Sequence, residues 1–166
     1  MTTVQVIEKH EFINELREDA ERYLQDKDFD IGDVELKGDQ FDELEYFIHN
    51  VGFYTTYFLV LCKQLEYGVK LFSNFKYDAK SSCKRIDHLR YNIENYIIRF
   101  HSLSDRLLQV INSVFHLTVN EDAVNYSVIM TNLKVARTGV PAKYRLFRKH
   151  IGRLNLDRNI ILHRHS

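Results

Sequence analysis

The sequence predicts an all-α fold, an antiparallel bundle of four or five helices that forms one domain over residues 1–166. Three observations support this prediction. The chain has one proline and six glycines, so long stretches run without a turn signal. Apolar residues recur every three or four positions in several segments, as on one face of an α-helix. Hydrophobic residues make up 45% of the chain and charged residues 28%, which is ordinary for a globular protein.

Two helices are expected in the first half of the chain. Residues 7–25 alternate apolar and charged positions in the pattern of an amphipathic helix. An acidic loop that contains Gly32 and Gly38 follows. Residues 41–72 are apolar nearly all round in their middle, so we expect them to form a central and largely buried helix.

The clearest helical pattern covers residues 82–117. Apolar residues recur there with the 3.6-residue period over about ten turns. A shorter helix should begin at a cap formed by residues 120–122 and should end near residue 136.

Two further short helices are expected in the C-terminal part. Residues 138–141 contain a glycine and the only proline, which predicts a break. A basic helix over residues 142–151 follows and ends before Gly152. The final helix then begins at Asn155 or Asp157, which are both favourable N-cap residues.

Charge is distributed unevenly along the chain. The 23 acidic and 23 basic residues give a formal net charge of zero. Residues 1–45 carry 15 acidic and 5 basic side chains, whereas residues 134–166 carry 1 acidic and 9 basic ones. We therefore expect the C-terminal part to face a polyanion such as RNA. A solvated basic face that balances the acidic N-terminal helix is the alternative.

Cysteine usage and hydropathy predict a cytoplasmic protein. Cys62 and Cys83 are isolated in helical context, which suits small core residues in a reducing compartment better than a disulfide framework. The first ten residues lack the basic and apolar regions of a signal peptide. The most apolar run, residues 51–62, is too short to cross a bilayer, so no membrane partner is expected.

Arg158 and His163 are the candidate catalytic residues. Arginine carries a permanent cation whose donors fit phosphate oxygens, and histidine can accept and donate a proton near neutral pH. Such a pair can cleave a phosphodiester without a metal, so no cofactor is expected. Five helical positions correspond to about 500° of rotation, which leaves the two side chains roughly 140° apart. Their convergence needs a frayed helix start at the arginine, a folded-back arginine, or a twofold dimer that brings two such pairs to one cleft.

The segment Arg158-Asn159-x-x-x-His163 resembles the signature of HEPN domains, an arginine and a histidine separated by four to six residues, in the form with a polar residue after the arginine. Residues 94–112 are similar to the long helix of a prokaryotic HEPN branch. The resemblance implies a HEPN-like helical bundle that carries the motif on its last helix. It also implies a metal-independent endoribonuclease of toxin or antiviral-defence type, which acts as a homodimer and is controlled by an antitoxin or another regulatory protein.

In that activity, His163 would activate the ribose 2′-hydroxyl or protonate the leaving 5′-oxygen. Arg158 would bind the non-bridging oxygens and stabilise charge on the pentacoordinate phosphorus. The expected products carry 2′,3′-cyclic phosphate and 5′-hydroxyl ends, and DNA should be inert. Asn159 is expected to orient the motif or bind phosphate. Arg99 and Asp105, six positions apart on the long helix, are expected to give polar support beneath the site.

Two features depart from the family pattern. Some toxin members that are paired with a nucleotidyltransferase antitoxin carry a tyrosine, which becomes modified, two residues after the motif histidine. His165 occupies that position here, so we do not expect this modification. The chain also ends three residues after His163, and we expect a C-terminal helix that is truncated relative to the family.

A basic segment beside the motif is the candidate RNA-binding surface. Tyr144 and Phe147 are interleaved with its cations, and charge combined with aromatic faces suits single-stranded RNA. The sequence slightly favours a second interpretation, in which the two rings form the buried side of an amphipathic helix. The candidate RNA-binding residues are Lys143, Arg145, Arg148, Lys149, Arg153 and Arg164.

Other interpretations stay open. The same fold could bind RNA or a partner protein without cutting, or could be a plain helical adaptor in which the motif is only surface charge. A metal site of His150, His163 and His165 has no accompanying cysteine or carboxylate pattern. Glu45-x-x-x-His49 lacks the spacing of di-iron bundles, and the glycines never cluster into a phosphate-binding loop.

Overall fold

The computed structural model describes residues 2–24, 42–73 and 84–163, and for residues 152–163 it describes the helical backbone alone. These residues form seven α-helices and one 3-10 turn and include no strand, which confirms the all-α prediction. The acidic loop with Gly32 and Gly38 lies outside the described residues, as does Cys83. The elements are α1 (Thr3–Glu8), α2 (Glu11–Leu24), α3 (Glu43–Ser73), α4 (Arg85–Val114), the 3-10 turn (Glu121–Ala123), α5 (Tyr126–Thr131), α6 (Leu133–Ala136) and α7 (Val140–His163).

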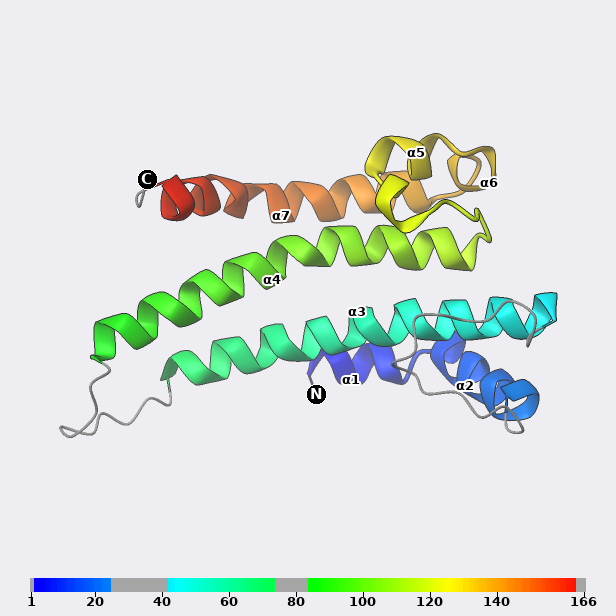
Figure 1. Ribbon diagram of the computed structural model, residues 1–166, viewed down its shortest axis with the longest axis horizontal. Helices are drawn as coiled ribbons and strands as arrows, with labels where there is room; N and C mark the ends of the chain where they lie inside the picture. Colours follow the sequence, from blue (N-terminus) through cyan, green and yellow to red (C-terminus); the bar gives the residue numbers. More distant parts are fainter. Residues whose placement is uncertain (1, 25–41, 74–83, 164–166) are drawn as a thin grey trace.

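Three long helices form the body of the molecule. α3 and α4 lie side by side as an antiparallel pair, and α7 lies along the other side of α4 (Figure 1). α1 and α2 pack against α3, whereas α5 and α6 pack near the start of α7. The N-terminal half of α4 diverges from α7 and stays with α3 (Figure 1). The long helix pair is therefore covered by acidic helices on one side and by the basic α7 on the other.

The N-terminal region contains two helices where the sequence predicted one. α1 begins earlier than predicted because Thr2 and Gln5 form a capping box, in which each side chain bonds the backbone N–H of the other residue. A turn at Lys9 and His10 then separates the two helices, and the His10 Nδ1 atom accepts a hydrogen bond from the Phe12 N–H at 3.2 Å. His10 thus caps the start of α2.

The single helix predicted to follow residues 120–122 is also divided. Residues 121–123 form only a 3-10 turn. The Asn125 side chain then accepts from the Val128 N–H at 3.1 Å, and the Asn132 side chain accepts from the Lys134 N–H at 3.0 Å. Each asparagine is the N-cap of a new short helix, so the predicted cap was placed too early.

The predicted break at Gly152 is wrong, and so are the predicted caps at Asn155 and Asp157. α7 is one helix of 24 residues that begins at Val140, next to the predicted proline break, and runs through Gly152 to His163. A single glycine costs a helix interior only about 1 kcal/mol relative to alanine, which neighbouring turns can offset. The motif therefore lies at the end of a long helix and not on a short separate one.

A buried hydrophobic cluster lies where α4, α5, α6 and α7 meet. Its fully buried members include Ile129 and Val135 of the two short helices. Tyr144 of α7 belongs to the same cluster and is 3% exposed. The short helices therefore anchor the first half of α7 to α4, and they fix where the rest of α7 projects.

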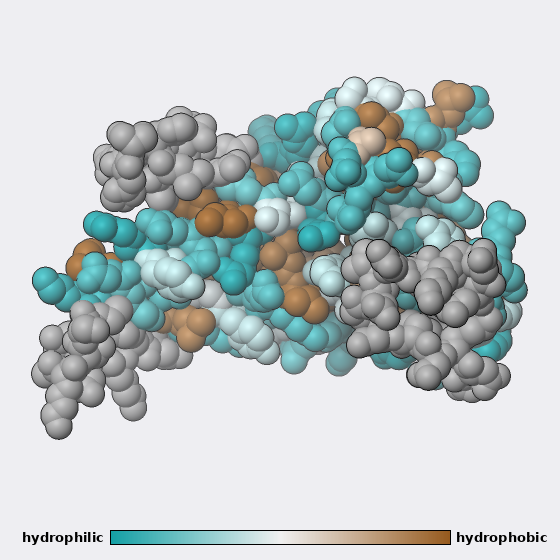
Figure 2. Space-filling model, viewed as in Figure 1, coloured by the Kyte–Doolittle hydropathy of each residue, from teal (hydrophilic) through white to brown (hydrophobic). Residues whose placement is uncertain are grey.

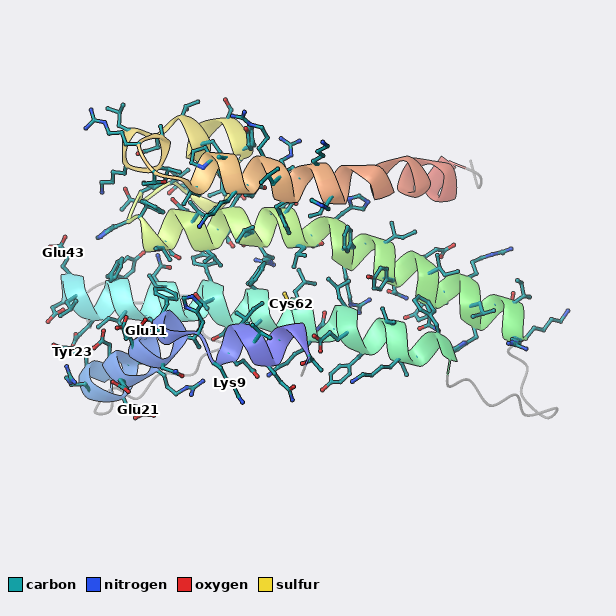
Figure 3. The ribbon with its side chains drawn as sticks, turned by 180° about the vertical axis from the view of Figure 1, so that it is seen from behind. Lys9, Glu11, Glu21, Tyr23, Glu43 and Cys62 are labelled. Atoms are coloured by element: carbon teal, nitrogen blue, oxygen red, sulfur yellow. The ribbon has the colours of Figure 1, made fainter. Side chains whose placement is uncertain are left out.

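Cys62 is a half-buried thiol on the side of α3 that faces α4 (Figure 3), which agrees with its prediction as a small core residue. Burial, followed by the nearby Glu66 carboxylate, raises the pKa of the Cys62 thiol to about 11. The thiol is therefore protonated near neutral pH and is a poor nucleophile. Across the described part of the chain, no helix is long and apolar enough to span a bilayer.

Candidate functional site

The predicted catalytic motif lies at the C-terminal end of α7 (Figure 1). Arg158, Asn159 and His163 all occupy helical backbone positions, and their side chains fall outside the structural description. Because α7 starts at Val140, Arg158 lies inside a continuous helix and not at a frayed helix start. That removes one of the three ways in which the arginine and the histidine could converge. A folded-back arginine and a twofold dimer remain.

Tyr144 sets the register between α7 and α4. Its hydroxyl donates to the Ser104 carbonyl oxygen at 3.1 Å and lies 2.6 Å from the Ser104 hydroxyl. Arg158 lies fourteen positions further along α7, a rise of about 21 Å. Since the two helices are antiparallel, the motif arginine lies level with the first turns of α4, near residue 90.

The two residues expected to support the motif lie elsewhere on α4. Arg99 faces α3, where its Nε donates to the Gln64 Oε1 atom at 3.2 Å. Asp105 is exposed and lies close to Tyr144. Burial raises the pKa of the Tyr144 hydroxyl, and the nearby negative charge of Asp105 also acts to raise it. The structure brings neither residue to the level of Arg158, nor does it bring the two together.

The predicted RNA-binding cations follow the first half of α7. Lys143, Arg145, Arg148 and Lys149 are exposed, and within the described residues none has a carboxylate within ion-pair distance. The Arg148 guanidinium lies 4.8 Å from the centroid of the Tyr126 ring. The side chain of Arg153 and the whole of Arg164 lie outside the described residues.

The aromatic residues of this segment are part of the core. Tyr144 is buried in the hydrophobic cluster between α4, α5, α6 and α7, and Phe147 packs against that cluster. The centroids of the Tyr144 and Phe147 rings lie 5.9 Å apart. This confirms the interpretation that the two rings form the buried side of an amphipathic helix. The Tyr144 ring is therefore unavailable to stack on RNA bases, and the Phe147 ring is partly covered by the core.

The charged side chains are distributed unevenly in space as well as along the sequence. Acidic side chains such as Glu11 and Glu21 lie on α2, and Glu43 lies at the start of α3 (Figure 3). Those helices lie on the side of α4 opposite to α7 (Figure 1). The face in Figure 2 is mostly hydrophilic, with a few separate hydrophobic patches. A polyanion would therefore be attracted to the α7 side and repelled by the α2 side.

The remaining candidate constellations have structural roles or are incompletely described. Glu45 and Asp42 form a capping box at the start of α3, with bonds of 2.9 and 2.8 Å to each other's backbone N–H. His49 is buried, which lowers its pKa, and it stacks on Phe53. His150 is exposed with its Nδ1 atom 2.7 Å from the Leu146 carbonyl oxygen. Among the described residues, no group of three histidine, cysteine or acidic residues could hold a metal.

The sequence did not reveal a pocket between α3 and α4 that is lined by both apolar and polar side chains. Tyr91, Asn95 and Arg99 of α4 line one wall of it, and Gln64 of α3 lines another. The first three residues are spaced by four positions, so their shared helical face could have been recognised in the sequence. The sequence does not show which part of α3 lies opposite that face.

The chain matches a model of a known protein family, and the match covers most of its helices. A family model described as HEPN_Cthe2314-like HEPN matches residues 39–166, which is 128 of the 166 residues. The match includes the long helix pair, the short helices and the whole of α7, and it excludes α1 and α2. No curated protein and no solved structure matches the chain significantly. The chain thus belongs to the HEPN family, in the branch that the Cthe2314-like model describes.

Proposed function

We propose that this protein is a metal-independent endoribonuclease whose active site combines Arg158 and His163 from two copies of the chain. Membership of the HEPN family supports an RNA-related or nuclease role in general. The observation that carries the specific proposal is the continuity of α7, which places the arginine–histidine motif on the same helix as four exposed cations. RNA attracted by that helix would be held beside the motif.

The dimer is proposed for a geometric reason. On one continuous helix, Arg158 and His163 point roughly 140° apart, so one copy presents them poorly to a single phosphate. A twofold axis near the end of α7 would place Arg158 of one subunit next to His163 of the partner subunit. Each phosphate would then meet a cation and a proton carrier from opposite sides.

The proposed reaction uses the 2′-hydroxyl of the RNA itself. The histidine removes the proton of this hydroxyl, and the oxygen attacks the adjacent phosphorus as the bond to the 5′-oxygen breaks. The leaving oxygen takes a proton from the second histidine of the dimer or from water. Arg158 donates to the non-bridging oxygens and stabilises the charge that builds up on them. Asn159 is proposed to donate to the same phosphate or to orient the motif.

We propose a biological role in toxin activity or antiviral defence, because a nuclease of this chemistry would act on the cell's own RNA and would need control. An antitoxin or another regulatory protein would supply that control. A second candidate function belongs to a different class: a HEPN-fold module that binds RNA without cutting it, or that binds a partner protein. The exposed cations favour this alternative as much as they favour a nuclease, since charge alone supports binding.

Incubation of the purified full chain with single-stranded and structured RNA in excess EDTA tests the proposal. We expect cleavage with cyclic-phosphate ends, and we expect His163→Ala and Arg158→Ala each to slow it by about 10²-fold or more. His150→Ala is the matched histidine control because His150 is exposed on the same helix, and this variant should cleave like the unchanged protein. Binding without cleavage, or cleavage that persists in both motif variants, would favour the binding module.

A further inference from the structure

The pocket between α3 and α4 joins a guanidinium group to a row of aromatic side chains. Its volume is about 300 Å³, at the lower end of the range for small-molecule sites, which is roughly 300–1,000 Å³. Along α4 the pocket extends from Arg99 to Tyr91, which corresponds to about 12 Å of helix axis. A hollow of this volume and length suits a small organic molecule that carries a single ring.

Arg99 forms the polar end of this pocket, and three hydrogen bonds hold its side chain in place. Its Nε donates to the Gln64 Oε1 atom at 3.2 Å, and its Nη1 donates to the Asn95 carbonyl and side-chain oxygens at 3.3 and 3.2 Å. Within the described ranges, the Arg99 Nη2 atom has no hydrogen bond and no carboxylate lies within ion-pair distance of the guanidinium. This cation therefore has a fixed position and one nitrogen that is available to an anion from solution.

The side-chain amides of the lining differ in whether their donors are already used. The Asn92 and Asn95 side-chain nitrogens each donate to the carbonyl oxygen four residues earlier in α4, at 2.9 Å. The Gln64 Nε2 atom has no hydrogen bond to any residue that the structure describes, and it shares its carbon with the oxygen that accepts from Arg99. The polar end therefore offers two neighbouring donors, Gln64 Nε2 and Arg99 Nη2. A carboxylate has two acceptor oxygens, so one such group can accept from both.

Aromatic rings form most of the remaining lining. Tyr67 of α3 and Tyr91 of α4 are 58% and 66% exposed, so their faces are largely uncovered. Tyr96 packs between Phe72 and Phe100 and provides a fixed floor. Exposed tyrosine faces are surfaces against which another aromatic ring can pack.

Gly68 keeps the middle of the pocket open. It lies between Gln64 and Leu71 on α3, and a Cβ atom at this position would lie 3.1 Å from the Tyr96 ring. A side chain there would press on the floor of the pocket. Arg99 is the one charged side chain among the described residues of the lining, so the pocket presents a single positive charge at one end and aromatic and apolar side chains beyond it.

We propose that this pocket binds an aromatic monocarboxylate, with the carboxylate at Arg99 and Gln64 and the ring against the tyrosine side chains. One negative charge matches the one guanidinium, and the two carboxylate oxygens match the two available donors. A neutral aromatic ligand would leave the guanidinium without a counter-ion, whereas an aliphatic acid would leave the rings uncovered. No residue of the Arg158–His163 motif lines the pocket, so this inference does not depend on the ribonuclease proposal.

Calorimetric titration of the full chain with benzoate, phenylacetate and 3-phenylpropanoate tests the site, because these acids differ in the distance between ring and carboxylate. We expect at least one to bind with a Kd below about 1 mM. The carboxamide of that acid lacks the charge and should bind at least about tenfold more weakly. Hexanoate has the carboxylate without the ring and should also bind at least about tenfold more weakly.

Variants of the two ends of the pocket locate the bound acid. Arg99→Gln and Tyr91→Ala should each raise the Kd of the acid by about tenfold or more. Two exposed residues of α2 supply matched controls: Arg17→Gln removes an arginine and Tyr23→Ala removes a tyrosine outside the pocket. Both control variants should bind like the unchanged protein.

The stability of the variants is measured first. Arg99→Gln removes a bond that joins α4 to α3, so its thermal unfolding is compared with that of the unchanged protein. Tyr91 is exposed, so its truncation should leave the fold intact and supplies an independent result. Failure of all three acids to bind at 1 mM, or equal binding by Tyr91→Ala and the unchanged protein, would overturn the proposal. Equal affinity for the acid and its carboxamide would also overturn it.

The same chemistry occurs in a free aryl acid and in an aromatic residue at the C-terminus of a protein. A pentapeptide that ends in phenylalanine, prepared with a free and with an amidated C-terminus, separates these two sources. If the free-carboxylate peptide displaces the bound acid and the amidated peptide does not, the pocket accepts a protein C-terminus. If neither peptide displaces it, the ligand is a free aryl acid. His163→Ala should bind the acid like the unchanged protein, so this result and the cleavage result are read separately.

Discussion

The Tyr144 hydroxyl of α7 lies 2.6 Å from the Ser104 hydroxyl of α4, and it also donates to the Ser104 carbonyl oxygen at 3.1 Å. These two contacts join the motif-bearing helix to the second half of α4, where the Tyr144 side chain is buried. They fix the register of the two helices, and with it the level at which Arg158 lies. Stability and the position of the motif are therefore coupled through one tyrosine.

Tyr144→Phe should lower the free energy of unfolding by about 1 kcal/mol, because it removes the bonds to Ser104 and leaves the Ser104 hydroxyl without its partner. Urea unfolding checks this, with a lower midpoint and an unchanged slope as the expected result. Tyr23→Phe is the control, since Tyr23 is exposed on α2. An equal loss in both variants would mean that the Ser104 contact contributes nothing specific.

Alkaline pH should destabilise the protein partly through Cys62. The pKa of this thiol rises from its ordinary 9.0 to about 11 in the folded chain, chiefly because of burial. A raised pKa means that the folded state favours the protonated thiol, so its contribution is fully present below pH 9 and is lost as the pH rises through 11. We expect the free energy of unfolding to fall less steeply between pH 9 and 11 in Cys62→Ala than in the unchanged protein. Parallel curves over that window would contradict the assignment.

The long helices were predictable because their sequence signals extend over many residues. The apolar spacing in α4 follows the 3.6-residue repeat over many turns, and the middle of α3 is a long segment that is apolar nearly all round. The starts of the short helices depend instead on single side chains. Thr2 with Gln5 is a recognisable capping pair, whereas the choice of Asn125 over Asn120 as a cap depends on how the chain packs.

The candidate site was predictable only in part. The sequence located Arg158 and His163 on the last helix, but it predicted a short helix that begins beside Arg158. The burial of Tyr144 and the packing of Phe147 against the core followed from amphipathic spacing. Gly152 led to a wrong prediction of the helix boundary. One glycine costs a helix only about 1 kcal/mol, and the stability of the neighbouring helical turns easily exceeds this cost. The pocket between α3 and α4 needs the pairing of these two helices, which is a tertiary contact that no local pattern specifies.

The two glycines inside α3 should respond differently to alanine. A Cβ on Gly52 meets nothing within 4 Å, so Gly52→Ala should stabilise the protein by about 0.5–1 kcal/mol through the higher helix propensity of alanine. A Cβ on Gly68 lies 3.1 Å from the Tyr96 ring, which packs against Phe72 and Phe100. Gly68→Ala should therefore stabilise the protein less than Gly52→Ala does, or should destabilise it. Urea unfolding of both variants makes the comparison, and equal gains would show that the Tyr96 ring moves freely.

The exposed cations of α7 should control the salt dependence of RNA binding. Each phosphate contact contributes about −0.7 to the slope of log affinity against log salt for a single strand. Lys149→Gln and Arg145→Gln should each reduce the magnitude of that slope by about this amount, measured by anisotropy with 2′-O-methyl RNA between low and physiological salt. Arg17→Gln on α2 should change nothing. A slope that stays the same in the α7 variants would place the RNA on another face.

Complementation between two inactive variants should reveal a composite active site. In a mixed dimer of Arg158→Ala and His163→Ala chains, one site pairs the intact Arg158 of one subunit with the intact His163 of the other, while the second site has neither. Random mixing makes half of the dimers mixed, so refolding the two proteins together should restore about a quarter of the original cleavage rate. Refolding either variant alone should restore none. If the mixture forms dimers by sedimentation yet stays inactive, the arginine and histidine of each site come from the same chain, and the folded-back arginine becomes the required geometry.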